Sequence, residues 1–594
     1  MKASPGRLPN HCPVRARASL FLLLFVTVAS AVVGVAPGRA AASVTRTGYV
    51  AVRDGTLLKY TVVLPRAGGR FPTLMEYSGY EPGTVPDAPY IARFVPQGYA
   101  FIGVSLRGTG CSGGVWDFFQ PVEAIDGYDV IEWIARQRWS NGRVAMIGKS
   151  YPGITQLFVA EQRPPHLVAV APGHVFADAY RDVPYPGGIL NYAFAAGWSF
   201  VSQPEPSYDA GLRGLAAGDP ICAQNLAARP NNVPHNPFLQ AEQHRFDDAI
   251  FRERSPLERI EQINVPVWTV LSWQDEQVGS RAVHLLERLR APHHVVLTNG
   301  DHSMYRTPPA LDELNRFFDH YVKGVRNGFE RTPPIRIWWE AGRDKKRAPG
   351  WVTSLRSWPP KSTARRLPLG PGGTLGGASS GDPDRYLYAG PTGQGIQNAR
   401  YSGVVTQPDA YLWDVPPPPG AAVSYTTSPL AKPLTALGSA SADLWLSSTA
   451  PDTDVQVTLT EVRPDGQEEF VQVGWLRASH RMLDPAKSRP TRPYQTHQQA
   501  DSRPLTPLEP ALLRVEIFPF GHVFRAGSRI RMWVEGPTLL PQLWGFAALP
   551  LPAANAVYHD AAHASALVLP AVDVKAKRGL PPCNSVIRQP CRAA

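Results

Sequence analysis

Apolar residues between Thr56 and about Lys323 form short continuous runs that alternate with stretches of helical spacing. Several runs are apolar throughout and rich in β-branched residues, which is typical of strands buried on both faces of a parallel sheet. This rhythm predicts an α/β layer architecture. The strand candidates are residues 57–64, 72–77, 100–106, 144–147, 167–171, 265–271 and 295–298.

The pattern changes in two later regions. Residues 176–250 carry prolines, glycines and the aromatic run NYAFAAGWSF but no clear strand, so we expect a helical cap inserted into the α/β domain. Beyond residue 335 apolar and polar residues alternate between regular turns such as Pro464-Asp465-Gly466, which predicts an antiparallel β-sandwich. The expected divisions are an α/β domain over 43–175 and 251–335, a cap over 176–250, a β-sandwich over 336–575 and a tail over 576–594.

The first 42 residues read as a secretory signal peptide. Basic Arg15 and Arg17 precede an apolar stretch over 18–35, and Ala40-Ala41-Ala42 offers a cleavage site of small residues. We expect a secreted, extracellular protein with no stable membrane insertion once the signal is removed. The alternative is an uncleaved membrane anchor formed by residues 18–35, whose length is near the lower limit for spanning a bilayer.

Net charge bears on the expected binding partners, and cysteine content on the expected disulfides and metal sites. The formal net charge is +11, but part of this excess lies in the first 42 residues, which hold no acid, and no basic run with interleaved aromatics follows. Nucleic acid is therefore not an expected partner. In an exported chain Cys583 and Cys591 are expected to close a small loop, and Cys111 could pair with Cys222. No Cys/His spacing suggests zinc, and no cofactor or metal is expected.

Candidate chemistry appears at Ser150, in AMIGKSYPGITQ. The G-x-S-x-G nucleophile pattern fails here, yet it occurs at 110–114 and 377–381, where the serines lie in loops. Ser150 alone stands between a buried strand and a helix, with Pro152 in the first helical turn, where a missing N–H costs nothing. We interpret Ser150 as a nucleophile on a sharp strand-to-helix turn. The alternative is an ordinary N-cap serine.

Suitable partners follow two later strands. The strand over 265–271 is followed by Asp275, our candidate acid, with Glu276 as its rival, and the strand over 295–298 is followed by His302, our candidate base. A serine hydroxyl needs such a base and an orienting carboxylate, and the order Ser, acid, His is that of α/β-hydrolases. The Tyr151 N–H and the Tyr80 hydroxyl are the expected oxyanion donors; alternatively Tyr80 only lines the pocket.

These motifs resemble the cocaine esterase and Xaa-Pro dipeptidyl-peptidase family of serine hydrolases. Its G-x-S-Y-x-G signature matches GKSYPG at 148–153, GYAFIGVSLRGTGCSGG from Gly98 is similar to its R-G loop, and the segment from Ser428 is similar to its C-terminal domain. The resemblance implies an α/β-hydrolase fold with a helical cap and a C-terminal jelly-roll. It also implies Ser150, His302 and Asp275 as the triad, with Tyr151 and Tyr80 as the oxyanion hole.

The substrate is less constrained by the sequence. Members of such a family cleave small-molecule esters, amides or short peptides with proline at the second position, and a dipeptidyl-peptidase must bind a free amine. Asp178 and Asp182 are candidates for that anchor, and Trp198 and Trp273 for apolar substrate contacts; each could instead be structural. The alternative function is a wall-associated carbohydrate-binding protein with a degenerate hydrolase domain. Oligomeric state is left open.

Overall fold

The computed structural model describes the chain from residue 42 onward with several gaps. The described residues are 42–194, 198, 212–229, 236–390, 393–394, 413, 416–538, 544–547, 549–550, 552–575, 577 and 579–594. The expected signal peptide therefore lies outside the described residues, as does part of the expected cap. Within the described part, no helix combines the length and the apolar character needed to cross a membrane.

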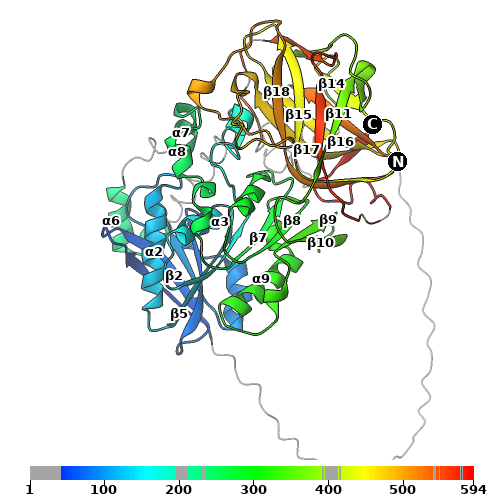
Figure 1. The fold of residues 1–594 in the computed structure, drawn as a ribbon. Coiled ribbons are helices and arrows are strands. Elements are labelled where there is room, and N and C mark those ends of the chain that lie inside the picture. The colour runs from blue at the N-terminus through cyan, green and yellow to red at the C-terminus, as the bar shows by residue number, and fades with distance from the viewer. Residues whose placement is uncertain are drawn as a thin grey trace, which may run out of the picture. The chain divides into compact units, whose positions relative to one another are not determined.

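The α/β part is built on one ten-stranded sheet (Figure 1). Strands β3 to β9 in the interior pair in parallel. At one edge β1 and β2 pair antiparallel with each other and β2 with β4, and at the other edge β10 pairs antiparallel with β9. The sheet order is β1-β2-β4-β3-β5-β6-β7-β8-β9-β10. The strands are β1 Val44–Ala51, β2 Leu57–Leu64, β3 Phe71–Ser78, β4 Ala100–Ser105, β5 Ser140–Lys149, β6 Leu167–Gly173, β7 Val267–Ser272, β8 His293–Thr298, β9 Ile335–Trp339 and β10 Trp351–Leu355.

Every strand predicted between residues 57 and 298 is present, and β4, β7 and most of β8 are buried along their length, as continuous apolar runs require. Helices α1 Ala88–Phe94, α2 Pro121–Ala135, α3 Tyr151–Glu161 and α9 Pro308–Tyr321 connect or follow these strands. The α/β-hydrolase fold is thereby confirmed. The sheet also runs further than expected, because β9 and β10 pair with β8 and with each other. The sheet therefore continues past the expected boundary at residue 335.

The segment between β6 and β7 holds short helices and no strand among its described residues. These are α6 Pro220–Ala228, α7 Pro237–Gln243 and α8 Ala249–Glu253. The Cys111–Cys222 disulfide joins α6 to the loop after β4. Buried Arg181 ties the segment to the C-terminal domain by donating to the carbonyls of Gln495 and Thr496 at 2.9 Å.

The C-terminal part is all β, as predicted. Its central strands β15 and β18 pair over most of their length, and β15 also pairs with β21, so the strands form a closed ring rather than two separate sheets. A register shift between Gly438 and Ala440 bends β15 so that it can contribute to both sides. The strands are β11 Thr363–Gly370, β12 Thr374–Leu375, β13 Asp384–Tyr388, β14 Ala422–Thr426, β15 Leu434–Ser448, β16 Asp454–Val462, β17 Gln467–Arg477, β18 Ala511–Phe524, β19 Arg529–Glu535, β20 Ala553–Tyr558 and β21 Ala566–Ala571.

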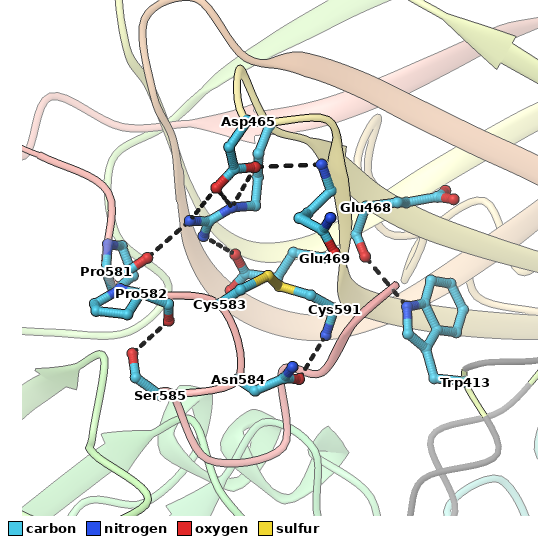
Figure 2. Close-up of a disulfide and its surroundings, with 12 residues drawn as sticks. Trp413, Asp465, Glu468, Glu469, Pro581, Pro582, Cys583, Asn584, Ser585 and Cys591 are labelled. Atoms are coloured by element: carbon cyan, nitrogen blue, oxygen red, sulfur yellow. Dashed lines mark hydrogen bonds and ion pairs between the residues drawn. A yellow bond between two sulfur atoms is a disulfide. The ribbon is translucent and has the colours of Figure 1, made fainter. Parts of the chain in front are cut away.

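The tail closes a loop through the expected Cys583–Cys591 disulfide (Figure 2). Asn584 accepts the Cys591 N–H across this loop at 2.9 Å. The tail then adds strand β22 Cys591–Ala593 to β17, and its Ile587 is buried in the core of the α/β part. The expected Cys583–Cys591 pair is confirmed, and the Cys111–Cys222 pair, which the sequence left open, is also present. The tail is an integrated part of the fold.

Candidate active site

Ser150 occupies a strained turn between β5 and α3. Its backbone has φ 64° and ψ −134°, a conformation that non-glycine residues rarely adopt outside functional sites. The turn is possible because Gly148 and Gly153 lack side chains: a Cβ at Gly148 would lie 2.7 Å from Pro152, and one at Gly153 would lie 2.6 Å from the Gly173 carbonyl. The spacing of the two glycines is therefore dictated by packing of α3 against β5 and β6.

The Ser150 hydroxyl meets Tyr80, which follows β3. The Tyr80 hydroxyl is hydrogen-bonded to the Ser150 side chain and accepts the Trp198 Nε1–H at 3.1 Å. Burial raises the pKa of Tyr80, with the hydrogen bonds from Trp198 and Ser150 opposing that rise, so the phenol stays protonated and can donate. Tyr151 is the first residue of α3, and its N–H belongs to the helix start, where N–H groups have no acceptor within the helix.

Asp275 and His302 form a buried pair. The His302 Nδ1 lies 2.9 Å from each carboxylate oxygen of Asp275. Asp275 is itself fixed by the N–H groups of Gln277 and Val278, which donate to Oδ1 at 2.9 and 3.1 Å. Glu276, the rival acid, accepts the backbone N–H of His302 at 3.0 Å and does not bond the ring. Asp275 is therefore the carboxylate that orients the imidazole.

The surroundings set the charge of this pair. Burial alone would raise the pKa of Asp275, but attraction to His302 and hydrogen bonds from His174 and His302 hold it well below 3.8. Burial lowers the pKa of His302 to about 4; Asp275 opposes this shift, while the Lys149 cation adds to it. His302 is thus a neutral imidazole at ordinary pH, as a general base must be.

The link between His302 and Ser150 is open in this structure. The buried His302 Nε2 has no hydrogen-bond partner among the described residues, and the Ser150 hydroxyl is engaged with Tyr80 instead. Hydrogen bonds between nucleophile and base are often long or misaligned without substrate and tighten in the complex. An unpartnered buried nitrogen at this position is a ready acceptor for a hydroxyl proton.

A second histidine, which sequence reasoning missed, contacts the same carboxylate. His174 follows β6 directly, is buried, and has its Nδ1 2.8 Å from Asp275 Oδ2. The rings of His174 and His302 lie 5.0 Å apart. No motif marks His174 in the sequence; the usable signal is its position at the carboxyl end of a parallel strand next to β5 and β7.

An apolar pocket opens at Ser150. Counted out to its open mouth it encloses about 830 Å³, a size suited to a small organic ligand. Among the described residues, its polar lining is formed by Tyr80, Ser150, Gln240 and Arg254, besides the edge of Tyr151. Arg254 is neutralised by a bidentate pair with Asp117. The apolar lining is formed by Phe118, Phe119, Ile154, Phe176, Ala179, Val183, Pro184, Phe194, Trp198, Pro237, Ala241, Ile250, Phe251 and Val278.

Trp198 lies in this pocket, as expected, but the other predicted substrate contacts do not. Asp178 is paired with Arg181 at 2.8 Å, and Asp182 with Arg281 at 2.8 Å while also accepting two backbone N–H groups. Both carboxylates are buried and neither lines the pocket. The prediction that they anchor a substrate amine therefore finds no support in these contacts.

Trp273 borders a different cavity, between the acid loop and the C-terminal domain, together with Asp275, Glu276 and Trp475. The loop that carries it is tied to that domain: the Gln274 amide donates to the Val471 carbonyl at 3.0 Å, and Gln472 donates to the Trp273 carbonyl at 2.7 Å. The predicted role of Trp273 in substrate contact is not supported. The same contacts indicate that the β domain holds the acid loop.

One cluster in the described part of the chain could share a metal ion: His174, Asp275 and His302, whose ligand atoms lie within 4.8 Å of one another. Their contacts of 2.8–2.9 Å have the length of charge-assisted hydrogen bonds. The second nitrogen of His174 already accepts the Tyr305 N–H at 3.1 Å. We therefore assign this cluster to hydrogen bonding around the base, not to metal binding.

Comparisons with known proteins agree with this geometry. Residues 54–304 match the S15 family of X-Pro dipeptidyl-peptidases, and residues 327–568 match the C-terminal non-catalytic domain of X-Pro dipeptidyl-peptidases. The chain belongs to this family of serine hydrolases. A putative serine esterase of Mycobacterium bovis is 26% identical over 88% of this chain and 95% of its own length.

Two further family members extend the comparison. A cocaine esterase of a Rhodococcus species is 27% identical over 74% of this chain and 84% of its own length. The crystal structure of a CocE/NonD family hydrolase from Staphylococcus aureus, 23% identical, superposes with a TM-score of 0.71 over 89% of this chain and 94% of its own. The named relatives include esterases, whereas the matching family description is that of a peptidase. Family membership therefore gives the reaction class, and the substrate has to be inferred from the pocket.

Proposed function

We propose that the protein is an exported serine esterase that cleaves esters of uncharged, apolar acyl groups. The observation that carries this proposal is the placement of Ser150 at an apolar pocket whose described lining includes no aspartate or glutamate. An acyl chain or ring would be bound there by burial of its apolar surface, at about 25 cal/mol per Å². Export is supported by two disulfides and by the signal-like first 42 residues.

In the proposed reaction the Ser150 Oγ attacks the ester carbonyl carbon while His302 Nε2 takes the hydroxyl proton. Asp275 stabilises the resulting imidazolium through its hydrogen bonds to Nδ1. The Tyr80 hydroxyl and the Tyr151 N–H would stabilise the oxyanion. His302 then returns the proton to the leaving alcohol, and water, activated by the same base, releases the acid from the acyl-enzyme.

The second candidate is an X-Pro dipeptidyl-peptidase, which the matching family description favours. That activity requires a group that binds the substrate's free amine. Asp178 and Asp182 are each occupied by an arginine. Charge and lining in the described part of the pocket therefore favour the ester.

Matched substrates test the choice. Purified protein is assayed with p-nitrophenyl acetate, butyrate and benzoate, and with Gly-Pro-p-nitroanilide. We expect ester turnover with kcat/KM rising with acyl size, and little release from the anilide. Ser150→Ala should abolish ester turnover. Efficient release from the anilide that falls when Asp178 or Asp182 is replaced by asparagine would overturn the ester assignment in favour of the peptidase.

A further inference from the structure

The dipeptide Gly173-His174, at the end of β6, contacts the loops that carry all three proposed catalytic groups. The His174 Nδ1 reaches Asp275 at 2.8 Å, its Nε2 accepts the N–H of Tyr305 in the loop that follows His302, and the preceding Gly173 carbonyl accepts the Ser150 N–H at 2.9 Å. The His174 side chain is fully shielded from solvent. A single dipeptide at the end of β6 thus meets the nucleophile turn, the acid loop and the base loop.

The hydrogen bonds of His174 define its tautomer. The Tyr305 N–H can only donate, so the His174 Nε2 that faces it must carry a lone pair and no proton. A neutral imidazole with an unprotonated Nε2 carries its proton on Nδ1, the nitrogen that faces Asp275. His174 is therefore a permanent donor to the carboxylate, whereas His302, whose Nε2 is unpartnered among the described residues, is free to exchange a proton.

We propose that His174 is a positioning residue, which donates a fixed Nδ1–H to Asp275 and so sets both the orientation and the hydrogen-bonding strength of the carboxylate toward His302. This inference rests on the proposed function, in which His302 is the base. Because Asp275 accepts hydrogen bonds from two donors, it stabilises the His302 imidazolium less than it would with one donor. The pKa of His302 therefore stays low enough for the imidazolium to give its proton to the leaving group.

Other ionisable groups also face His302 and must stay constant in a test. Lys149 is the last residue of β5, and Asp275 and Glu276 follow β7. Around Lys149 and Glu276 lie Asp301 and Arg306, from the loop after β8, and Arg588 of the tail. Replacing His174 alone leaves all of them in place. The fall of kcat/KM on the acidic side of its pH profile, called the acidic limb below, then reports the pKa of His302 in the free enzyme.

Two variants separate the hydrogen bonds of His174. Asparagine places an amide N–H near the position of Nδ1 and loses the acceptor for Tyr305; glutamine places an amide oxygen near Nε2 and loses the donor to Asp275. We expect His174→Asn to retain kcat within about 5-fold, and His174→Gln to lower kcat about 10- to 100-fold, the effect of losing one hydrogen bond to a buried charge, with KM little changed. In His174→Gln the acidic limb should also move to higher pH.

Equal effects of the two variants, or an unmoved acidic limb in His174→Gln, would show that His174 only fills space. If neither variant folds, low-field proton NMR of protein with unaltered His174 decides. Replacing Asp275 by asparagine should shift two low-field imidazole N–H signals, of which His302→Ala removes one; a shift of a single signal would overturn the proposal. Failure of the proposed function is distinguishable, because ester turnover would then survive Ser150→Ala whatever His174 does.

Discussion

Replacement of Tyr80 by phenylalanine removes one hydroxyl from the proposed oxyanion hole. In the structure this hydroxyl is bonded to Ser150 and Trp198, and burial keeps it protonated by raising the pKa of Tyr80. A donor in such an apolar pocket needs no reorientation when negative charge develops. Loss of one oxyanion donor costs about 2.7–4 kcal/mol, so we expect kcat for p-nitrophenyl butyrate to fall about 10²- to 10³-fold with little change in KM.

The matched control is Tyr151→Phe. Its hydroxyl accepts the Trp116 Nε1–H at 2.7 Å, and its ring lies 5.7 Å from that of Tyr80. The control removes a hydroxyl from the same aromatic cluster but keeps the Tyr151 backbone N–H. We expect a loss in kcat below about 10-fold, from the unpaired indole N–H alone. Equal kcat values for the two variants, both near wild type, would refute the role of Tyr80.

Further predictions concern pH, the pocket and the disulfides. Because burial lowers the pKa of His302 to about 4, kcat/KM should fall only well below pH 6.5. Lys149→Gln removes a cation that disfavours the imidazolium, so it should move that fall to higher pH. A fall of wild-type kcat/KM that begins above pH 6.5 would contradict this. Ala179→Leu should narrow the pocket and lower kcat/KM for benzoate relative to acetate about 10-fold; an unchanged ratio would exclude this site for the acyl group. A disulfide stabilises more when it closes a longer loop of the unfolded chain. Replacing Cys111 and Cys222, which are 111 residues apart, should therefore lower the free energy of unfolding by about 4–5 kcal/mol, and replacing Cys583 and Cys591, which are 8 residues apart, by about 2–3 kcal/mol. Calorimetry that ranks the two pairs in the reverse order would contradict this expectation.

The strands of the central sheet could be predicted because parallel strands are buried on both faces and read as continuous apolar runs. The edge strand β1 escaped detection because half of its residues are exposed. Strands β9 and β10 were not predicted, because an isolated short strand carries no information about which sheet it joins. The ring closure of the C-terminal domain depends on the pairing of β15 with β21, which are distant in sequence.

The Asp275–His302 pair could be anticipated because the proposed catalytic groups were sought after strand ends. His174 also follows a strand end, but a lone histidine gives no sign of the carboxylate it will meet. The proposed roles of Asp178 and Asp182 find no support in the structure for a different reason: their sequence surroundings fit a pocket wall as well as an ion pair. The Asp182–Arg281 pair forms only when the cap segment packs against the residues that follow the acid loop. Arg181, the partner of Asp178, is fixed by its contact with the β domain.

Covalent labelling tests the central claim most directly. The protein is incubated with a fluorophosphonate, which reacts with an activated serine, and the adduct is located by mass spectrometry of proteolytic fragments. We predict one adduct, on Ser150, at a rate that falls strongly in His302→Ala. An adduct on another serine, or none while ester turnover proceeds, would contradict the account.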